Sequence, residues 1–214
     1  MPTALSPRRR RYHLTAAFLA LSLWLGGCAG VYRVDSQVQS YARWEQGTDG
    51  AVPTGQQHYR FERLPSQREG NAVLAQDQLE SLTRTALAKS GWQMAAPGST
   101  ATWSVQVSAD MRTLPRAPWD EPWGGVGIGW GLYGGNGFFG THWMLRSDMP
   151  YHERKVSLVI RRVTSGQVVY ETHADHDGRW NSTPELWGAM LEAALKDFPD
   201  PPAGARQINI DLPR

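Results

Sequence analysis

Two stretches of the sequence carry an apolar stripe at helical spacing, and neither stripe can be buried by its own helix. The first stretch predicts a helix over residues 73–90, with a stripe made of Ala75, Leu79, Leu82 and Ala86. The second predicts a helix over residues 182–198, with a stripe made of Trp187, Met190, Leu191, Ala194 and Phe198. Both helices therefore need a further apolar surface to pack against.

The ends of both helices are marked by residues with known terminal preferences. Gly91 follows the first helix as a stop signal. Ser182 and Glu185 have the spacing of a capping box, and Pro184 falls in the first turn, where its missing N–H is tolerated. Pro199 then ends the second helix. These signals predict two helices of defined length.

The packing surface comes from segments in which apolar and polar residues alternate, a pattern typical of strands with one buried face. Alternation is clearest from Trp103 to Met111. A tight turn at residues 164–167 joins two later strands, so the middle of the chain predicts an antiparallel meander. Strands are predicted at residues 31–38, 58–62, 103–111, 156–160, 168–172 and 208–210. We therefore expect an α+β fold: an antiparallel sheet of about five to six strands with both helices on one face.

The N-terminus has the three parts of a secretory leader. Four consecutive arginines begin at Arg8, residues 12–25 are almost wholly apolar, and Gly26 and Gly27 precede Cys28. The apolar run is shorter than the ~20 residues that a membrane-spanning helix needs. Leu25-Gly26-Gly27-Cys28 resembles the cleavage site of bacterial lipoproteins. That resemblance implies removal of residues 1–27, lipidation of Cys28 and, because residue 29 is Ala and not Asp, sorting to the outer membrane facing the periplasm.

Removal of the leader changes what the composition allows. The full chain has a net charge of +2, but loss of the four leader arginines leaves 18 basic and 20 acidic residues, a net charge of −2. No basic excess remains to favour nucleic acid. Cys28 is the single cysteine, so a lipidated mature chain has no disulfide, thiolate metal site or thiol nucleophile.

The mature chain divides into a lipidated N-terminus with a first strand and tether at 28–57, one α+β domain at 58–200, and a C-terminal tail at 201–214. Within the domain, residues 115–150 form a glycine- and aromatic-rich segment, in which nine of the seventeen residues from Gly124 to Gly140 are glycine. Its aromatic residues are Trp119, Trp123, Trp130, Tyr133, Phe138, Phe139 and Trp143. Three interpretations stay open: a long flexible loop, a contact surface for a protein partner, or insertion at a membrane interface.

Residues 173–177, with the sequence His-Ala-Asp-His-Asp, are the one cluster with metal-ligand character. On an extended chain His173 and Asp175 point one way and His176 the other, so a metal site would require the strand to break. We expect these residues to be polar residues near a turn. No catalytic motif accompanies them, and we expect no catalytic residues, no metal and no cofactor.

Several short motifs in order resemble the bacterial lipoproteins grouped as domain of unknown function 4136. The motifs are Tyr59-Arg60-Phe61, Gly91-Trp92, the alternating strand 102–110, the paired segments 156–160 and 168–170, and Asp197-Phe198-Pro199. Tyr170 stands where members of the family have Trp. The resemblance covers about residues 30–200 and implies a lipid-anchored periplasmic domain without an established activity.

The sequence therefore favours a non-enzymatic, lipid-anchored envelope protein with a structural, assembly or protein-binding role. It would contact the membrane through lipid on Cys28 and bind an envelope protein through its sheet or the 115–150 segment. Two other hypotheses stay open: a carrier or sensor of a small apolar or lipid ligand held between sheet and helices, and a hydrolase using distant residues such as His173 or His176.

Overall fold

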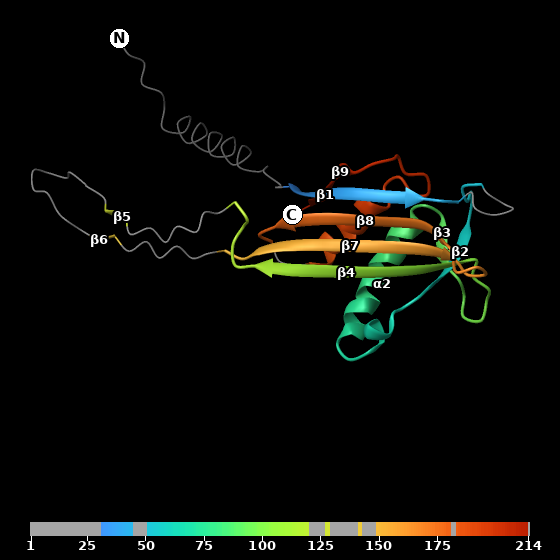
Figure 1. Cartoon of the computed structure of the whole chain (residues 1–214). Coiled ribbons are helices and arrows are strands. Elements are labelled where there is room, and N and C mark those ends of the chain that lie inside the picture. The colour runs from blue at the N-terminus through green and yellow to red at the C-terminus, as the bar shows by residue number, and fades with distance from the viewer. Residues whose placement is uncertain are drawn as a thin grey trace, which may run out of the picture. The chain divides into compact units, whose positions relative to one another are not determined.

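The computed structural model describes residues 31–44, 51–119, 127–128, 141–142, 149–180 and 183–213. Residues 33–210 form one compact unit, and residues 1–32 with 211–214 are grouped as a second. The first unit contains both α-helices and most of the main sheet, whose first and last strands in the chain extend beyond it by a few residues (Figure 1).

The unit is built on a seven-stranded sheet with the strand order β3-β2-β4-β7-β8-β1-β9. The strands are β1 (Val31–Ala42), β2 (Gln57–Phe61), β3 (Trp92–Met94), β4 (Trp103–Leu114), β7 (Tyr151–Arg162), β8 (Val168–Gly178) and β9 (Arg206–Pro213). A separate two-stranded pair, β5 (Gly127–Ile128) and β6 (Thr141–His142), lies within the glycine- and aromatic-rich segment.

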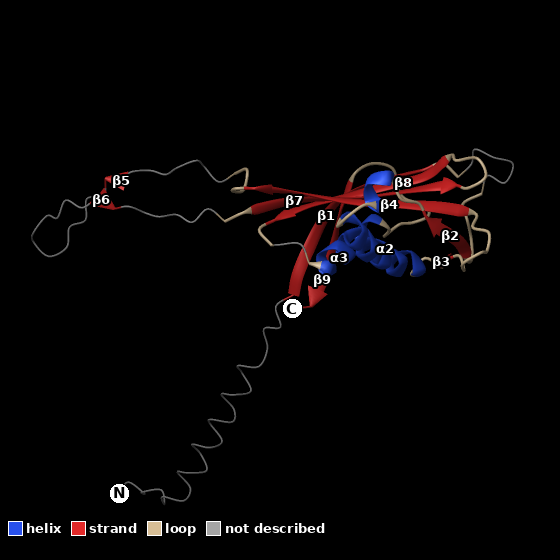
Figure 2. Cartoon of the chain, turned by 90° about the horizontal axis from the view of Figure 1, so that it is seen from below, coloured by secondary structure: helices blue, strands red, loops and turns tan. Residues whose placement is uncertain are grey.

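Among the described residues, three helical segments complete the fold: the short 3-10 helix η1 (Pro65–Arg68), α2 (Ala72–Ala88) and α3 (Pro184–Ala194). Figure 2 shows α2 and α3 on the same face of the sheet. They contact each other, and Lys89 Nζ, just after α2, lies 2.7 Å from Glu192 Oε2 on α3. The predicted α+β class, with two helices on one face, is confirmed.

The sheet differs from the expected one in number and direction of strands. β4, β7, β8 and β1 pair antiparallel, but β2 runs parallel to both of its neighbours, β3 and β4. The extra strand is β3, for which the sequence predicted no element. Gly91, with φ +79°, ends the helical region in a left-handed conformation and turns the chain into this strand.

The buried side of α2 overlaps the predicted stripe at Leu79 and Ala86 but also includes polar residues. Ala75 is exposed, whereas Gln76, Glu80 and Thr83 are buried beside the apolar Leu79, Ala86 and Leu87. Burial of these polar side chains is possible because each has a partner. The Thr83 hydroxyl, for example, donates to the Leu79 carbonyl over 2.8 Å.

The start of α3 is one residue later than the capping box predicted. Thr183 is the N-cap, with an extended backbone, and its Oγ1 accepts a hydrogen bond from the Leu186 N–H over 3.4 Å. Ser182 lies outside the described residues. Pro184 occupies the first turn, as expected.

The second half of β8 corrects the prediction for residues 173–177. These residues are not near a turn, because β8 continues through them to Gly178 and stays paired with β7 as far as His152. His176 is buried on the helix-covered side, while His173 and Asp175 lie on the other face and remain partly accessible. Because β8 is continuous through these residues, His173 and His176 lie on opposite faces of the sheet.

Aromatic rings fill the core at the end of the sheet where β4 begins. Trp44, Trp92, Trp103, Tyr170 and Phe198 are all buried, and the ring centroids of Trp92 and Phe198 lie 4.9 Å apart. Trp44 Nε1 donates to the Pro199 carbonyl over 2.8 Å, which ties the residues after β1 to the chain after α3. Tyr170 is therefore a core residue, and its ring centroid lies 4.8 Å from that of Phe198.

A candidate basic cleft and an uncharged groove

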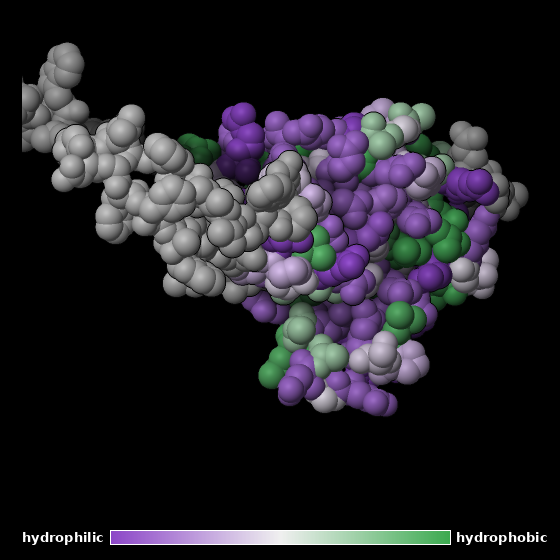
Figure 3. Space-filling model, turned by 60° about the vertical axis from the view of Figure 1, so that its left-hand side comes forward, coloured by the Kyte–Doolittle hydropathy of each residue, from purple (hydrophilic) through white to green (hydrophobic). Residues whose placement is uncertain are grey.

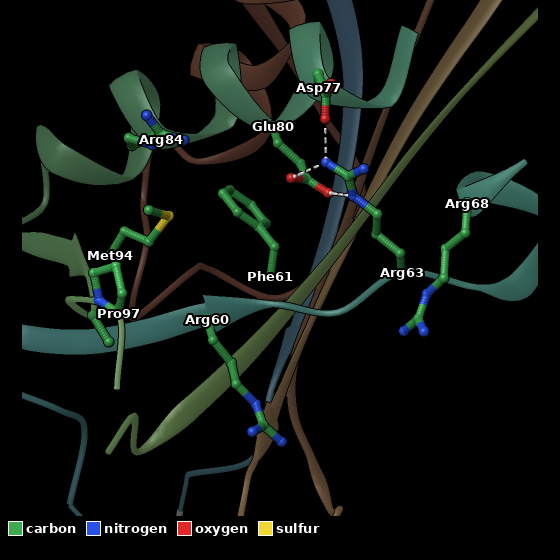
Figure 4. A pocket seen from close by; sticks show the side chains of 10 residues that line it. Arg60, Phe61, Arg63, Arg68, Asp77, Glu80, Arg84, Met94 and Pro97 are labelled. Atoms are coloured by element: carbon green, nitrogen blue, oxygen red, sulfur yellow. Dashed lines mark hydrogen bonds and ion pairs between the residues drawn. The ribbon is translucent and has the colours of Figure 1, made fainter. Parts of the chain in front are cut away.

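A cleft of about 740 Å³ opens beside the ends of β2 and β3, where α2 and η1 face the chain that follows β2. Its walls combine charged and apolar side chains, shown in Figure 4. The lining residues are Arg60, Phe61, Arg63, Arg68, Asp77, Glu80, Arg84, Met94, Ala95 and Pro97. The cleft will be called the arginine cleft.

An ion network built on Arg63 lies at the centre of the arginine cleft. Arg63 Nε lies 2.6 Å from Glu80 Oε1, and its Nη2 lies 2.7 Å from Glu80 Oε2 and 2.5 Å from Asp77 Oδ1. Asp77 and Glu80 are three residues apart on α2 and so share one face of the helix. Hydrogen bonds from Glu80 first, and from Asp77 second, hold the pKa of the Arg63 guanidinium above its ordinary value.

One glutamine amide holds the buried carboxylate of this network. Gln76 Nε2 donates to Glu80 Oε1 over 3.2 Å and to the Val107 carbonyl over 3.2 Å. Gln67 Nε2 donates to the same Val107 carbonyl over 3.1 Å, which ties η1 to β4. Glu80 therefore accepts hydrogen bonds from Gln76 and Arg63, and both carboxylates of the arginine cleft bind Arg63.

Three further arginines surround this network. Figure 4 shows Arg84 on α2 to one side of Phe61, Arg68 beyond Arg63, and Arg60 pointing away from α2 across β2. All three are exposed. Because Arg63 binds both carboxylates of the cleft, these carboxylates do not neutralise Arg68 and Arg84. The positive charge of Arg68 and Arg84 can therefore attract an anionic ligand that enters the cleft.

The floor of the arginine cleft is apolar. Phe61 packs edge-to-face on Tyr59, with ring centroids 5.3 Å apart, and Met94 and Pro97 face it. Tyr59 is fully buried, and burial raises its pKa to about 12, against a smaller opposing effect of Arg84. Arginine stays protonated at every physiological pH and only donates hydrogen bonds. The arginine cleft is therefore suited to binding carboxylates or phosphates, and not to moving protons.

A second depression, of about 330 Å³, lies between α2, the last part of β4 and Trp187 of α3. None of its lining residues is charged: Gln67, Ala72, Ala75, Gln76, Gln78, Leu79, Leu82, Ser108, Ala109, Met111 and Trp187. Its size and apolar lining fall within the range of small-ligand sites. It will be called the uncharged groove.

Comparison with known proteins decides the family. The family described as "Domain of unknown function (DUF4136)" matches residues 35–200, which include both the arginine cleft and the uncharged groove. This chain belongs to that family. The expected membership of this family is confirmed over almost the predicted range, and the lipid anchor stays a prediction. No curated protein matches the chain.

Solved structures add information on the fold of this family member. A PDZ domain protein from Parabacteroides distasonis is 11% identical with a TM-score of 0.51, covering 92% of this chain, which spans 42% of that protein. Two PelC dodecamer structures from Paraburkholderia phytofirmans, one of a single-substitution variant, are each 12% identical. Their TM-scores are 0.42 and 0.38, and the matches cover 74% and 75% of this chain and 95% and 94% of PelC. At such identities these likenesses concern the fold alone.

Of the site residues predicted from the sequence, Trp119 is described. It is 65% exposed, and its ring lies edge-to-face on Tyr151 with centroids 5.0 Å apart. Cys28 lies outside the described residues, and so do Trp123, Trp130, Tyr133, Phe138, Phe139 and Trp143. The prediction that the aromatic residues make a contact surface therefore stays a prediction.

The histidines do not form a catalytic pair in the described part of the chain. His176 Nδ1 lies 2.6 Å from the Asp35 carbonyl oxygen, and His152 Nδ1 lies 3.0 Å from Thr113 Oγ1. Residues 31–44, 51–119, 149–180 and 183–213 contain no group of three or more metal-ligating side chains. No helix among the described residues is long and apolar enough to cross a membrane.

The arginine cleft was not predicted from the sequence. Its one local signal is the concentration of Arg60, Arg63 and Arg68 within nine residues. Arg84 joins them only because α2 packs beside β2, and nothing in the sequence pattern gives that distance.

Proposed function

We propose that this chain is a non-enzymatic, lipid-anchored protein of the bacterial outer membrane that binds an acidic segment of another envelope protein in the arginine cleft. The anchor would be lipid on Cys28, after removal of residues 1–27, with the domain facing the periplasm. The role would be that of a protein-binding accessory in the assembly or organisation of the envelope.

The observation that carries this proposal is the charge balance of the arginine cleft. Four arginines meet two carboxylates there, and Arg63 binds both carboxylates at 2.5–2.7 Å. Clusters of arginine are a recurring means of recognising acidic motifs. The apolar floor around Phe61 adds room for the backbone and aliphatic parts of a peptide.

The absence of a catalytic role is part of the proposal. In support of this, the guanidinium groups of the cleft stay protonated at neutral pH and so do not act as acids or bases. The carboxylates of the cleft are engaged by Arg63 and Gln76. His173 and His176, the residues considered for a hydrolase, lie on opposite faces of β8. Binding is therefore the chemistry that this arrangement supports best.

Reversing the charge of Arg68 and Arg84 tests the proposal. The double variant Arg68→Glu, Arg84→Glu should bind a fluorescein-labelled deca-glutamate peptide at least about tenfold more weakly, a loss of roughly 1.4 kcal/mol. Binding by the unsubstituted protein should weaken as salt is raised, because exposed charges are screened. Fluorescence anisotropy of the purified protein with the labelled peptide measures both effects.

The matched control is Arg43→Glu, Arg112→Glu, which changes the net charge equally at two exposed arginines outside the arginine cleft. It should bind the peptide as the unsubstituted protein does. Equal affinities for the two double variants would contradict the assignment of the cleft. Tight binding of polygalacturonate, with none of the peptide, would assign the cleft to an anionic glycan and refute a protein partner.

The uncharged groove favours a second function, the carrying or sensing of a small apolar or lipid ligand between sheet and helices. Ala75 lines this groove but is exposed, so Ala75→Trp should fill it without disturbing the core. Native mass spectrometry of protein purified from the envelope should then show a bound mass that this variant loses. Leu74→Trp, at a 73% exposed position outside the groove, should retain it. A folded, unsubstituted protein without added mass would exclude this function.

A further inference from the structure

Four strand ends meet at one end of the sheet, opposite the arginine cleft. β4 ends at Leu114, paired with Tyr151 at the start of β7, and β8 ends at Gly178, paired with His152. β1 runs antiparallel to β8 in the register Gln37↔Asp175, so β1 enters the sheet at this same end. Figure 1 shows the start of β1, the start of β7 and the arrowheads of β4 and β8 together.

The described residues that project from this end will be called the tip: 113–119, 149–152 and 178–180. The tip exposes three large apolar side chains, Trp119 at 65%, Met149 at 60% and Trp180 at 46%. The base beneath them is ordered, because Ala117 and Tyr151 are buried and the Trp119 ring packs on Tyr151. Tryptophan is a side chain favoured at the boundary between lipid headgroups and hydrocarbon.

The charged side chains within the three ranges of the tip are basic, and Asp120 and Asp148 adjoin these ranges in the sequence. The tip contains Arg116, half-buried, and Arg179, exposed, and its three ranges include no Asp or Glu. The acidic residues nearest in the strands, Glu153 and Asp177, belong to the preceding register row. Figure 3 brings the left-hand side of Figure 1 forward, and the surface that it colours is mostly hydrophilic, with separate hydrophobic patches. The tryptophans and arginines of the tip together suit contact with lipid headgroups.

The length of the chain limits how far the tip can stand from an anchor at Cys28. Four residues lie between Cys28 and Arg33, the first residue of the compact unit, and the five Cα–Cα steps span at most about 18 Å when fully extended. β7 has twelve residues, so the opposite end of the sheet is about 40 Å away. A lipid on Cys28 therefore brings the tip near the membrane surface while the start of β4, beside the arginine cleft, can be held away from it.

From these observations we infer that the tip rests on a surface of anionic phospholipids and orients the domain so that the arginine cleft points into the periplasm. The inference depends on the lipid anchor of the proposed function. The arginines would meet phosphate groups, as basic residues near an anionic membrane surface do, and the two tryptophans would lie at headgroup level. One lipid anchor and a tip contact together give a stable, oriented attachment.

The test uses the lipidated protein in vesicles of phosphatidylethanolamine and phosphatidylglycerol that carry a headgroup-level spin-label quencher. Because lipid blocks the sulfur of Cys28, an introduced cysteine can be labelled alone with an environment-sensitive fluorophore. Pro118→Cys places the label in the tip, and Ser165→Cys places it in the exposed turn at the other end of β7. We expect quenching at position 118 to exceed that at position 165 several-fold.

Reversing the charge of the tip gives a second measurement on the same protein. Adding Arg116→Glu and Arg179→Glu to Pro118→Cys should remove most of the quenching while the protein still floats with the vesicles. The matched pair Arg43→Glu and Lys196→Glu, at two exposed basic residues outside the tip and the arginine cleft, should leave quenching unchanged. This comparison separates a specific contact of the tip from the general closeness that the lipid enforces.

Each outcome is decisive. Floating protein with position 118 unquenched, or with both positions quenched equally, overturns the inference and leaves the anchor intact. Protein that does not float refutes the anchor itself, and the inference with it. If position 118 stays unquenched in vesicles but is shielded from iodide in native outer membranes, a protein covers the tip and the lipid contact is wrong.

Discussion

Replacing Trp92 with alanine is expected to lower the free energy of unfolding by about 3–5 kcal/mol, in the range measured for buried large aromatic residues. Trp92 is 1% exposed, and its ring centroid lies 4.9 Å from that of Phe198 and 5.7 Å from that of Trp103. It begins β3, a strand of only three residues, so few other contacts hold this edge of the sheet. The loss would therefore combine a cavity with loosening of the strand.

Urea unfolding followed by far-ultraviolet circular dichroism measures this effect without relying on the fluorescence of the residue that is removed. The same substitution at Trp119, which is 65% exposed, is the control and should change stability by no more than about 1 kcal/mol. Equal midpoints for the two variants, at equal urea dependence, would show that the aromatic cluster is not the principal source of stability at this end of the sheet.

Replacing Cys28 with serine is expected to abolish fatty-acid incorporation and to remove the protein from the outer-membrane fraction. Serine lacks the thiolate that a diacylglyceryl group requires, so no lipid can attach and the leader is not removed by the lipoprotein route. Each buried methylene contributes about 0.8 kcal/mol, and loss of all acyl chains therefore abolishes stable attachment. Metabolic labelling with an alkyne fatty acid, together with fractionation, measures the change.

Ala29→Ser is the matched control, since it places the same side chain one residue later and keeps the thiol. It should incorporate label and stay with the outer membrane. If Cys28→Ser protein still carried label, or the unsubstituted protein carried none, the anchor and the inferred orientation of the tip would both be refuted. Retention in the membrane without label would instead show that the leader remains as the attachment.

The sequence predicted those elements in which burial follows a simple period. The alternation from Trp103 to Met111 corresponds to β4, and the turn at 164–167 joins β7 to β8 as expected. β3 was missed because three residues carry no measurable period, and the parallel direction of β2 cannot be read from a single strand. The residues 173–177 were misplaced because a polar strand, stabilised by its neighbour β7, shows no apolar alternation.

The face of α2 shows why the candidate site was harder to predict than the fold. Counting apolar residues selected Ala75, which is exposed, and passed over Glu80, which is buried because Arg63 and Gln76 satisfy its oxygens. Such burial depends on partners 17 and 4 residues away in the chain. A hydrophobicity pattern does not record which polar side chains pair with one another. The arginine cleft can therefore be recognised only in the folded structure.

The position of β1 has a consequence for the order in which the protein is made and folds. β1 is the first strand of the main sheet to be synthesised, yet its neighbours in the sheet are β8 and β9, the last two strands of the chain. The Ser40 and Thr172 hydroxyls, 2.8 Å apart in the buried core, are separated by 132 residues. Contacts of such long range slow folding. The earliest strand must therefore remain unpaired until nearly all of the chain has been made, which leaves it open to holding chaperones during that interval.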